Sequence, residues 1–357
     1  MQPLFRIYAG SEEITDVIRD RLIELVITDE AGIQSDELKL TLDDRRREDG
    51  AIAELPRIGA VLTVSLGYAK TRLISLGRFI VDEVEIRSPP ATLTVSAKAA
   101  DMVGPFRSPK TRSWDATTLG QLVEAIASEH RYQAKIDTEL GAIAIPHLDQ
   151  TEESDMALLT RLAAKHDAVA KPVAGFLVLA KQGAIKTITG QVMPTINLNP
   201  RDLAEWRYRH SARKPGGSGA SSDLDTQKPP ATTTGGTKAY WWDFEKGERR
   251  EVTTGSPPFE EIRYVHATEA EARAAAATRK NTGTRGQGAL SFSLLGDPRL
   301  AAEGRLSITL RPGLPTDWRI KRVEHRLSSQ GYTTQVECER FTASPASVTD
   351  TPTESNT

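Results

Sequence analysis

Five residues in one short segment carry functional groups from which a metal site or an acid–base pair could be built: His147, Asp149, Glu152, Glu153 and Asp155. Carboxylates and imidazoles bind divalent cations and transfer protons. Helix capping offers a simpler explanation. Acidic groups in a first helical turn lie close to exposed backbone N–H groups and to the positive end of the helix dipole. We therefore expect these residues to begin a helix and not to form an active site.

The residues that follow have the spacing of an amphipathic helix. Thr151 is the expected N-cap, and Met156, Leu159 and Leu162 recur on one face. We expect this helix to end near 166–167 and two short strands to follow before 182. Arg161 should pair with an acidic residue one or two turns away. The interaction candidates of this segment are Asp149, Gln150, Glu153, Asp155 and Arg161.

Elsewhere the sequence offers no stronger catalytic or metal site. Its six histidines lack a spacing that would hold a metal ion on one face of an element. The glycine-rich run 282–288 lacks the Gly-Lys-Ser/Thr end of a phosphate-binding loop, so we expect a loop before a strand. Cys338, the only cysteine, falls in an alternating run typical of a strand. We predict no catalytic residue, no metal and no cofactor.

Two alternatives stay open at this point. A glycosidase-like pair could exist among 48 acidic residues, although none stands out. Trp206, Tyr208, Trp241 and Trp242 could stack on sugars or bases, although packing in a core or an interface is the commoner role of such side chains.

Composition narrows the class of protein. A chain of 357 residues suggests two or three compact units. A net charge of -2 argues against a protein that binds nucleic acid mainly through the phosphate backbone. The N-terminus does not resemble a signal peptide, and no apolar run approaches the length of a membrane helix. We expect a protein made in a bacterial cytoplasm, with no membrane segment and no nucleic-acid sequence recognition.

The hydrophobic pattern predicts a mainly β fold with α/β inserts. Residues 1–105 contain about six alternating runs and should form a first antiparallel barrel. Residues 106–183 should form an α/β insert, with a helix capped by Asp115 and ending near His130. Residues 184–342, which begin with a strand at 184–190, should form a second barrel.

Three further segments complete the expected organisation. The Gly/Ser/Thr/Pro-rich stretch 211–237 is expected to be a flexible linker, followed by a hairpin near the two adjacent tryptophans. A short helix is expected at 268–280, with Thr268 and Glu271 as a capping box. The polar tail 343–357 is expected to be disordered.

Several of these runs resemble the late control D proteins, the baseplate hub family of contractile-tailed phages. The same family occurs in R-type pyocins and is related to the hub part of type VI secretion spikes. The resemblance covers most of the chain and is carried by 26–44, 56–68, 76–102, 145–183 and 304–337.

The resemblance implies a structural role in the virion tail or baseplate. Such hubs are trimers of a chain with two similar β-barrels, so six barrels form a pseudo-hexameric ring. This ring adapts the hexameric tail tube to the trimeric central spike. The implied partners are two further copies of the chain, the tail spike protein, the tail tube protein and other baseplate proteins, with the tape-measure protein as a further candidate.

Other readings remain as alternatives. A type VI secretion spike hub is the nearest one. A tail-associated enzyme acting on peptidoglycan would need a catalytic set that the sequence does not reveal. A cell-wall binding module would rest on the insert and its aromatic residues.

Overall fold

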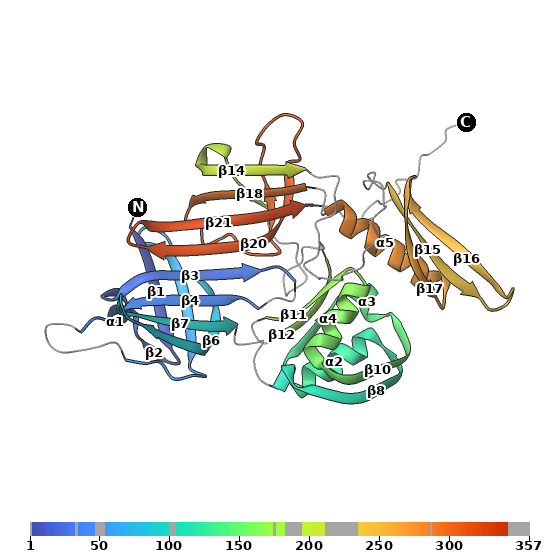
Figure 1. The fold of residues 1–357 in the computed structure, drawn as a ribbon, viewed down its shortest axis with the longest axis horizontal. Coiled ribbons are helices and arrows are strands. Elements are labelled where there is room, and N and C mark those ends of the chain that lie inside the picture. Colours follow the sequence, from blue (N-terminus) through green and yellow to red (C-terminus); the bar gives the residue numbers. More distant parts are fainter. Residues whose placement is uncertain are drawn as a thin grey trace, which may run out of the picture.

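One long, mostly antiparallel sheet runs through the computed structural model and joins strands from both ends of the chain. Its order is β14-β18-β21-β20-β3-β4-β7-β6-β5-β1-β2, with β19 beside β20 and β13 beside β19. In Figure 1 this sheet forms one half of an elongated molecule, and an α/β body and a projecting arm form the other half. The structure describes residues 2–32, 35–46, 54–99, 105–173, 176–182, 195–210, 235–285 and 288–341.

The first β unit comes from the N-terminal third of the chain. Its strands alternate as predicted: Leu38, Leu40 and Leu42 of β4 are buried, whereas Lys39 and Thr41 point to the other face. A core of aliphatic and phenylalanine side chains lies on one side of the sheet. The elements are β1 (Pro3–Ala9), β2 (Glu12–Glu13), α1 (Thr15–Arg19), β3 (Leu22–Glu30), β4 (Glu37–Asp43), β5 (Val61–Tyr68), β6 (Ile74–Arg87) and β7 (Thr92–Ala99).

The second β unit comes mostly from the C-terminal part of the chain and has its own core around Trp318, Ile320 and Val336. The strand predicted at 184–190 lies outside the described residues. The elements are β13 (Ile196–Asn197), η3 (Pro200–Asp202), β14 (Leu203–His210), β18 (Gly288–Leu295), β19 (Arg305–Ser307), β20 (Asp317–Ser328) and β21 (Gly331–Arg340).

The two units meet where β20 pairs with β3. The pairing is antiparallel and runs from Arg322 opposite Glu30 to Ser328 opposite Glu24. Arg322 Nε lies 3.2 Å from a Glu30 carboxylate oxygen, and Arg326 Nη1 lies 2.5 Å from a Glu24 carboxylate oxygen. The prediction of a mainly β fold with α/β inserts is confirmed, and the two β units share one sheet.

The two units also share a strand order. The order β3-β4-β7-β6-β5 of the first unit matches the order β14-β18-β21-β20-β19 of the second, element by element along the chain. Figure 1 shows the two sets of strands side by side. The chain therefore contains the same antiparallel arrangement twice.

Irregularities in the two units fall at matching places. β3 skips Ile23 in its pairing with β4, and β14 skips Ala204 in its pairing with β18. β6 skips Asp82 opposite β7, and β20 skips Lys321 opposite β21. Because β-bulges are retained features of a fold, these matches indicate that the two units have the same fold.

A turn is repeated as well. Gly59 donates its N–H to the carbonyl of Val81 at 2.8 Å, and Glu303 donates its N–H to the carbonyl of Ile320 at 3.0 Å. Gly59 and Glu303 both have positive φ angles, of 87° and 66°. Positive φ is ordinary for glycine and uncommon for glutamate, so the second turn keeps the shape of the first without its glycine.

The insert between the two units folds around two long helices, one short helix and two small sheets. One core fills it, with Leu122, Val123 and Ile126 of the first long helix against Leu158 and Leu162 of the second. The elements are η2 (Pro105–Arg107), β8 (Pro109–Thr118), α2 (Leu119–Glu129), β9 (Gln133–Ile136), α3 (Thr138–Gly141), β10 (Ala144–Ser154), α4 (Asp155–Lys165), β11 (Ala168–Val173) and β12 (Phe176–Lys181).

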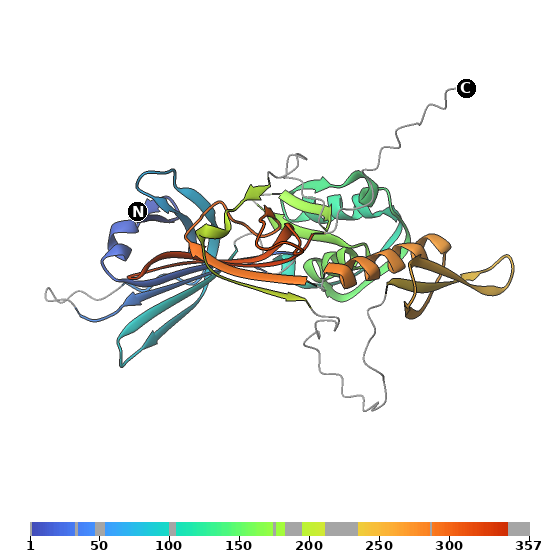
Figure 2. The same ribbon diagram turned by 90° about the horizontal axis from the view of Figure 1, so that it is seen from above.

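The chain segment that connects β14 to β18 forms an arm. Figure 2 shows this arm projecting from one end of the molecule. The predicted hairpin is present as β15 (Gly236–Asp243) and β16 (Glu248–Gly255), and β17 (Phe259–His266) completes a three-stranded sheet. The last element is α5 (Glu269–Arg285), which packs on this sheet through alanines that allow close approach.

Two predictions about the arm need correction. The helix expected at 268–280 runs on to Arg285, so the glycine-rich run 282–288, predicted as a loop, begins inside α5. The extension has a physical reason, because Arg285 forms an ion pair with Asp167 of the insert and fixes the last turn. The backbone N–H of Glu271 does donate to Thr268 Oγ1, at 3.2 Å, as half of the expected capping box.

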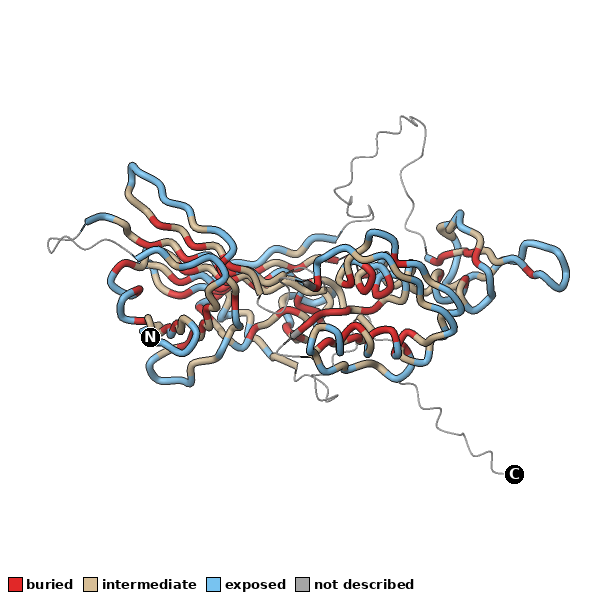
Figure 3. Tube along the Cα trace, turned by 90° about the horizontal axis from the view of Figure 1, so that it is seen from below, coloured by how far each residue is buried: buried red, intermediate tan, exposed pale blue. Residues whose placement is uncertain are grey.

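Two other predicted segments lie partly or wholly outside the residues that the structure describes. The predicted linker 211–237 lies outside the described residues up to 234, and 236–237 already belong to β15. The predicted tail 343–357 also lies outside them. Among the described residues, no helix is long and apolar enough to span a membrane. Figure 3 shows that buried residues concentrate in the long sheet and the insert, whereas much of the arm is exposed.

His325 should make the second unit sensitive to acid. Burial lowers the pKa of this histidine to about 4 from 6.5, and its Nε2 lies 3.1 Å from the carbonyl oxygen of Leu300. Between these pH values the unfolded chain binds a proton that the folded chain does not, so stability falls as the pH drops through the window. The total loss should be about 3 kcal/mol.

Urea unfolding at pH 7.5 and pH 4.5 measures this loss. His325→Gln should flatten the dependence, whereas His147→Gln should not, because His147 is exposed and its pKa is raised by Asp115 and Asp149. Equal acid losses in the original chain and in His325→Gln would contradict the assignment.

Candidate functional site

The structure divides the five interaction candidates between a strand and a helix. β10 carries Asp149, Gln150 and Glu153, whereas α4 begins at Asp155 and carries Arg161. All five therefore lie at one side of the insert, but only one of the acidic residues stands in a first helical turn.

Two predicted helix caps are wrong. Ser154, and not Thr151, caps α4, because its hydroxyl accepts a hydrogen bond from a backbone N–H of the first turn. Thr118, and not Asp115, caps α2, and it forms a complete capping box with Gln121. Asp115 instead lies opposite His147 in the antiparallel β8–β10 sheet, and Thr151 falls in the bulge of β10 between Gln150 and Glu153. Helix-dipole compensation therefore does not explain the acidic residues of β10.

Asp155 is the centre of a buried ion-pair cluster. Its side chain has no exposed surface. Lys110 Nζ and His130 Nε2 lie 2.6 Å and 2.7 Å from its Oδ2. Arg112 Nη2 and Gln150 Nε2 each donate to its Oδ1 at 2.8 Å. One carboxylate thus binds together β8, β10, α4 and the residue that follows α2.

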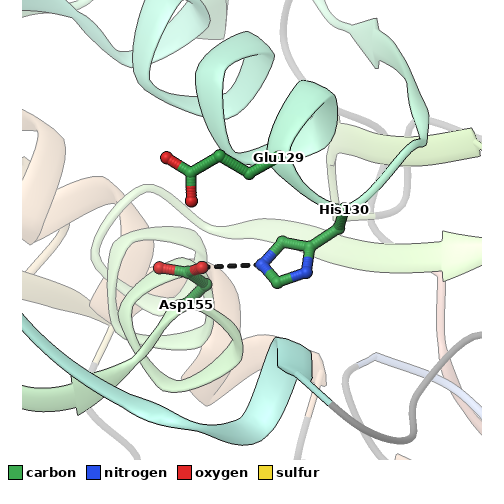
Figure 4. A group of neighbouring side chains, drawn as sticks. All are labelled: Glu129, His130 and Asp155. Atoms are coloured by element: carbon green, nitrogen blue, oxygen red, sulfur yellow. Dashed lines mark hydrogen bonds and ion pairs between the residues drawn. The ribbon is translucent and has the colours of Figure 1, made fainter.

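A second carboxylate completes the cluster. Glu129 accepts hydrogen bonds from Lys110 and Arg112, and Figure 4 shows it facing Asp155 and His130. The ligand atoms of these three residues lie within 4.8 Å of one another, which is close enough for a metal ion. Two cations already balance the two carboxylates, so the arrangement fits an ion-pair network better than a metal site.

Hydrogen bonding keeps Asp155 ionised. Burial alone would raise the pKa of this carboxyl group, because a low-dielectric environment disfavours charge. The hydrogen bonds from His130, Lys110 and Gln150, together with the charge of Arg112, outweigh burial and lower the pKa to about 2. The cluster therefore contributes stability above the ordinary aspartate range and loses it as the pH falls towards 2.

A surface groove lies beside the cluster and is called here the α4 groove. Its volume is about 610 Å³. Arg161 lines it and forms an ion pair with Glu153 at 2.7 Å, so the expected pairing of Arg161 is present. Glu152 stands in a β-bulge at a positive φ of 47°. The groove is lined by Arg107, Pro109, Asp149, Thr151, Glu152, Glu153, Ser154, Ala157 and Arg161.

Sequence reasoning missed the cations of the cluster. Lys110 and Arg112 alternate with other polar residues along β8, which gives the segment no apolar face. Their period-two spacing was the available signal, since it places both side chains on one face of a strand. His130 was expected only as the end of a helix, and it follows α2 directly.

A second set of charged side chains lies where the bodies meet. Lys171 of β11 donates to the Glu30 carbonyl oxygen at 3.0 Å and to Asp36 Oδ1 at 2.7 Å, which ties the insert to the first unit. Arg285 of α5 forms an ion pair with Asp167 and a hydrogen bond with Gln182, which ties the arm to the insert.

The second unit is connected to the same region. Arg319 is almost fully buried and donates to both carboxylate oxygens of Glu303 and to Glu339. Glu303 in turn accepts the backbone N–H of Gly32, at 2.8 Å. Charged groups therefore link all four parts of the molecule.

The aromatic residues considered for stacking have different surroundings. Trp241 packs against the alanine-rich core of the arm, and Tyr208 lies edge-on to Trp318 at 5.9 Å. Trp206 and Trp242 are exposed, on β14 and β15 respectively. These four residues do not gather into one binding surface, because two of them serve separate cores.

Solved tail proteins share this fold. A 43 kDa tail protein of prophage MuSo2 from Shewanella oneidensis matches with a TM-score of 0.66 at 15% identity, over 95% of this chain and 98% of that chain. A tail protein of Neisseria meningitidis matches with a TM-score of 0.64 at 11% identity, over 95% and 97%. At these identities the likeness establishes the fold alone.

Sequence comparison identifies the family. The profile of the phage tail baseplate hub (GPD) family matches residues 34–331. Probable baseplate hub proteins of Escherichia phage 186 and Escherichia phage P2 are each 31% identical to this chain, over 95% of its length and 93% of theirs. The chain belongs to the phage tail baseplate hub family. It is a structural protein of the virion tail baseplate.

Removing the charge of Asp155 should destabilise the insert strongly. Asp155→Asn leaves Lys110 and Arg112 partly buried with one carboxylate between them, which should cost about 3 to 5 kcal/mol. Asp149→Asn on the neighbouring strand β10 is the control and should change the free energy of unfolding far less, because Asp149 is exposed. Urea unfolding followed by circular dichroism measures both. Equal effects would contradict a structural role for the cluster.

Proposed function

We propose that three copies of this chain form a ring that connects the hexameric tail tube to the trimeric central spike. The observation that carries this proposal is the repeated β unit, with its matching strand order and matching bulges. Three copies of a chain with two similar units present six similar surfaces, so a six-fold tube can bind a three-fold hub.

The long sheet supplies a wall for the central channel. One face of the sheet carries both cores, and the other face is polar in both units. Directly paired residues form a polar row across seven strands: Glu205, Ser293, Gln335, Glu324, Thr28, Glu37 and Lys98. A polar, hydrated face of this extent suits a channel, because a hydrophobic wall would hold passing chains by apolar contact.

Partners are assigned by position. The tail tube and the spike contact the two ends of the ring, and the insert and the arm, which lie away from the sheet in Figure 1, contact other baseplate proteins. The α4 groove, with acidic and basic groups exposed side by side, is the candidate surface for such a contact. The tape-measure protein is a candidate for the channel itself.

A type VI spike hub is the second candidate role. A type VI component of E. coli has a TM-score of 0.50 over 90% of this chain and 74% of its own, and a Francisella PdpA–VgrG complex chain has 0.54 over 96% and 58%. The family match to phage hubs favours the phage role.

The oligomer is the first test. The purified chain should elute as a species of three times 39.0 kDa by size-exclusion chromatography with light scattering, alone or with its spike protein. Stable monomers in both conditions, at concentrations of tens of micromolar, would refute the ring.

The proposed role is structural and not catalytic. The support is that Asp155, at the centre of the buried cluster of the insert, forms ion pairs with Lys110 and Arg112. The full chain should therefore neither release soluble fragments from purified peptidoglycan nor sediment with it, whereas lysozyme as a control does both. Fragment release that is abolished by Asp149→Asn and Glu153→Gln together would establish an enzyme instead.

A further inference from the structure

Within one chain the two β units meet at a single junction, where β20 pairs with β3. Each of these two strands has a counterpart in the other unit. β20 corresponds to β6, and β3 corresponds to β14. We propose that β6 of one copy pairs with β14 of the next copy in the way that β20 pairs with β3 within the chain. This inference rests on the ring proposed above and identifies its subunit interface.

The bulges fix the correspondence residue by residue. Counting from the skipped residues Asp82 and Lys321, the stretch Val84–Arg87 aligns with Val323–Arg326. The two sequences are Val-Glu-Ile-Arg and Val-Glu-His-Arg. The match at three of four positions supports the register.

β3 and β14 are aligned in the same way, by counting from their skipped residues Ile23 and Ala204. This count aligns Glu24 with Glu205, and Leu25 with Trp206. Position by position, the edge of β14 is thus equivalent to the edge of β3 that β20 covers.

Both counterpart edges are open in a single copy. β6 pairs with β5 only up to Ile80, so its second half has β7 on one side and, among the described residues, no strand on the other. β14 pairs with β18 and ends the order of the long sheet within the described part of the chain. Open edges with unpaired N–H and C=O groups are places where another strand can add.

Exposed apolar side chains mark the same two edges. Ile86 of β6 is 56% exposed, whereas its counterpart His325 in the internal junction is 1% exposed. Trp206 of β14 is 44% exposed, whereas its counterpart Leu25 is 0% exposed. Positions that the internal junction buries are therefore left in water at the open edges, and pairing with a second copy would cover them.

Charges on the two edges repeat those of the internal junction. Arg326 forms ion pairs with Glu324 at 3.0 Å and with Glu24 across the junction. Its counterpart Arg87 already forms the first pair, with Glu85 at 2.8 Å. The second pair would join Arg87 to Glu205 of the next copy.

One like-charge contact follows from the same register. Arg207 falls opposite Arg87, and the carboxylates of Glu85 and Glu205 flank the two guanidinium groups. With Arg209 opposite Glu85, three guanidinium groups and two carboxylates meet at the interface, and the pairing should weaken as salt rises.

The pairing has the symmetry that a ring needs. β6 and β14 are different surfaces of the same chain, so the contact is head-to-tail, the type of contact that builds a ring when the rotation between copies closes. Each copy would contribute one internal junction and one junction to its neighbour, and the polar face of the sheet would continue from copy to copy.

A disulfide between the two edges tests the register. Glu324 lies opposite Thr28 in the internal junction, so Glu85 should lie opposite Arg209 of the next copy. The full-length Glu85→Cys, Arg209→Cys double variant should form covalent dimers and trimers on oxidation, seen on a non-reducing denaturing gel. Either single variant should stay monomeric on that gel, because the native Cys338 is buried.

A matched control separates specific pairing from chance collision. Lys39→Cys with Arg209→Cys places two thiols on the same polar face, but Lys39 lies within the sheet on β4 and away from the open edges. This pair should cross-link at least ten times more slowly. Equal rates for the two pairs would overturn the assigned interface.

Charge reversal gives an independent reading. Glu205→Arg should shift the trimer towards monomer in light scattering, because it adds a third guanidinium group beside Arg87 and Arg207, and a further Arg87→Glu change should restore the trimer. A trimer that Glu205→Arg weakens and that the added Arg87→Glu change does not restore would overturn the Arg87–Glu205 pair. Trimers that neither cross-link through the designed pair nor respond to reversal would refute this interface and leave the ring intact. Monomers in every variant and in the original chain would refute the ring itself.

Discussion

The pairing of β20 with β3 is the constraint on which the rest of the molecule depends. Each β unit has a core of its own, so hydrophobic burial alone would allow the two units to lie in many relative positions. Backbone hydrogen bonds along seven paired positions remove that freedom, and the Arg322–Glu30 and Arg326–Glu24 ion pairs fix the register. The distance and angle between the repeated units are thus set inside one chain.

The other bodies attach close to this junction. Lys171 of the insert binds the carbonyl of Glu30 at the end of β3, and the N–H of Ala302 in the second unit donates to Asp29 at 2.8 Å. The arm reaches the same region through Arg285 and Glu339, whose side chains lie 3.9 Å apart. Buried charge is costly unless it is well paired, so these contacts favour one geometry over others more than they add to stability. A structural hub of a baseplate requires a fixed geometry of this kind.

Sequence patterns predicted what is local. Alternation revealed β4 and β5, and the apolar stripe of α4 revealed that helix. β10 was missed, because its residues Asp149 to Glu153 read as a helix start and its partner β8 has no apolar face. The shared sheet could not be read from the sequence, since the pairing of β3 with β20 joins residues about three hundred positions apart. The resemblance implied two similar units, but their strand-by-strand match was not visible in the sequence, because a core face needs only apolar side chains of suitable size.

Single-particle electron microscopy of the assembled hub tests the central claim most directly. The account predicts a closed ring of three copies in which six β units surround a channel, the polar face of the sheet turns inwards, and the junctions within and between chains look alike. A symmetric dimer with the same surface on both partners, or a ring whose polar sheet face points outwards, would contradict it.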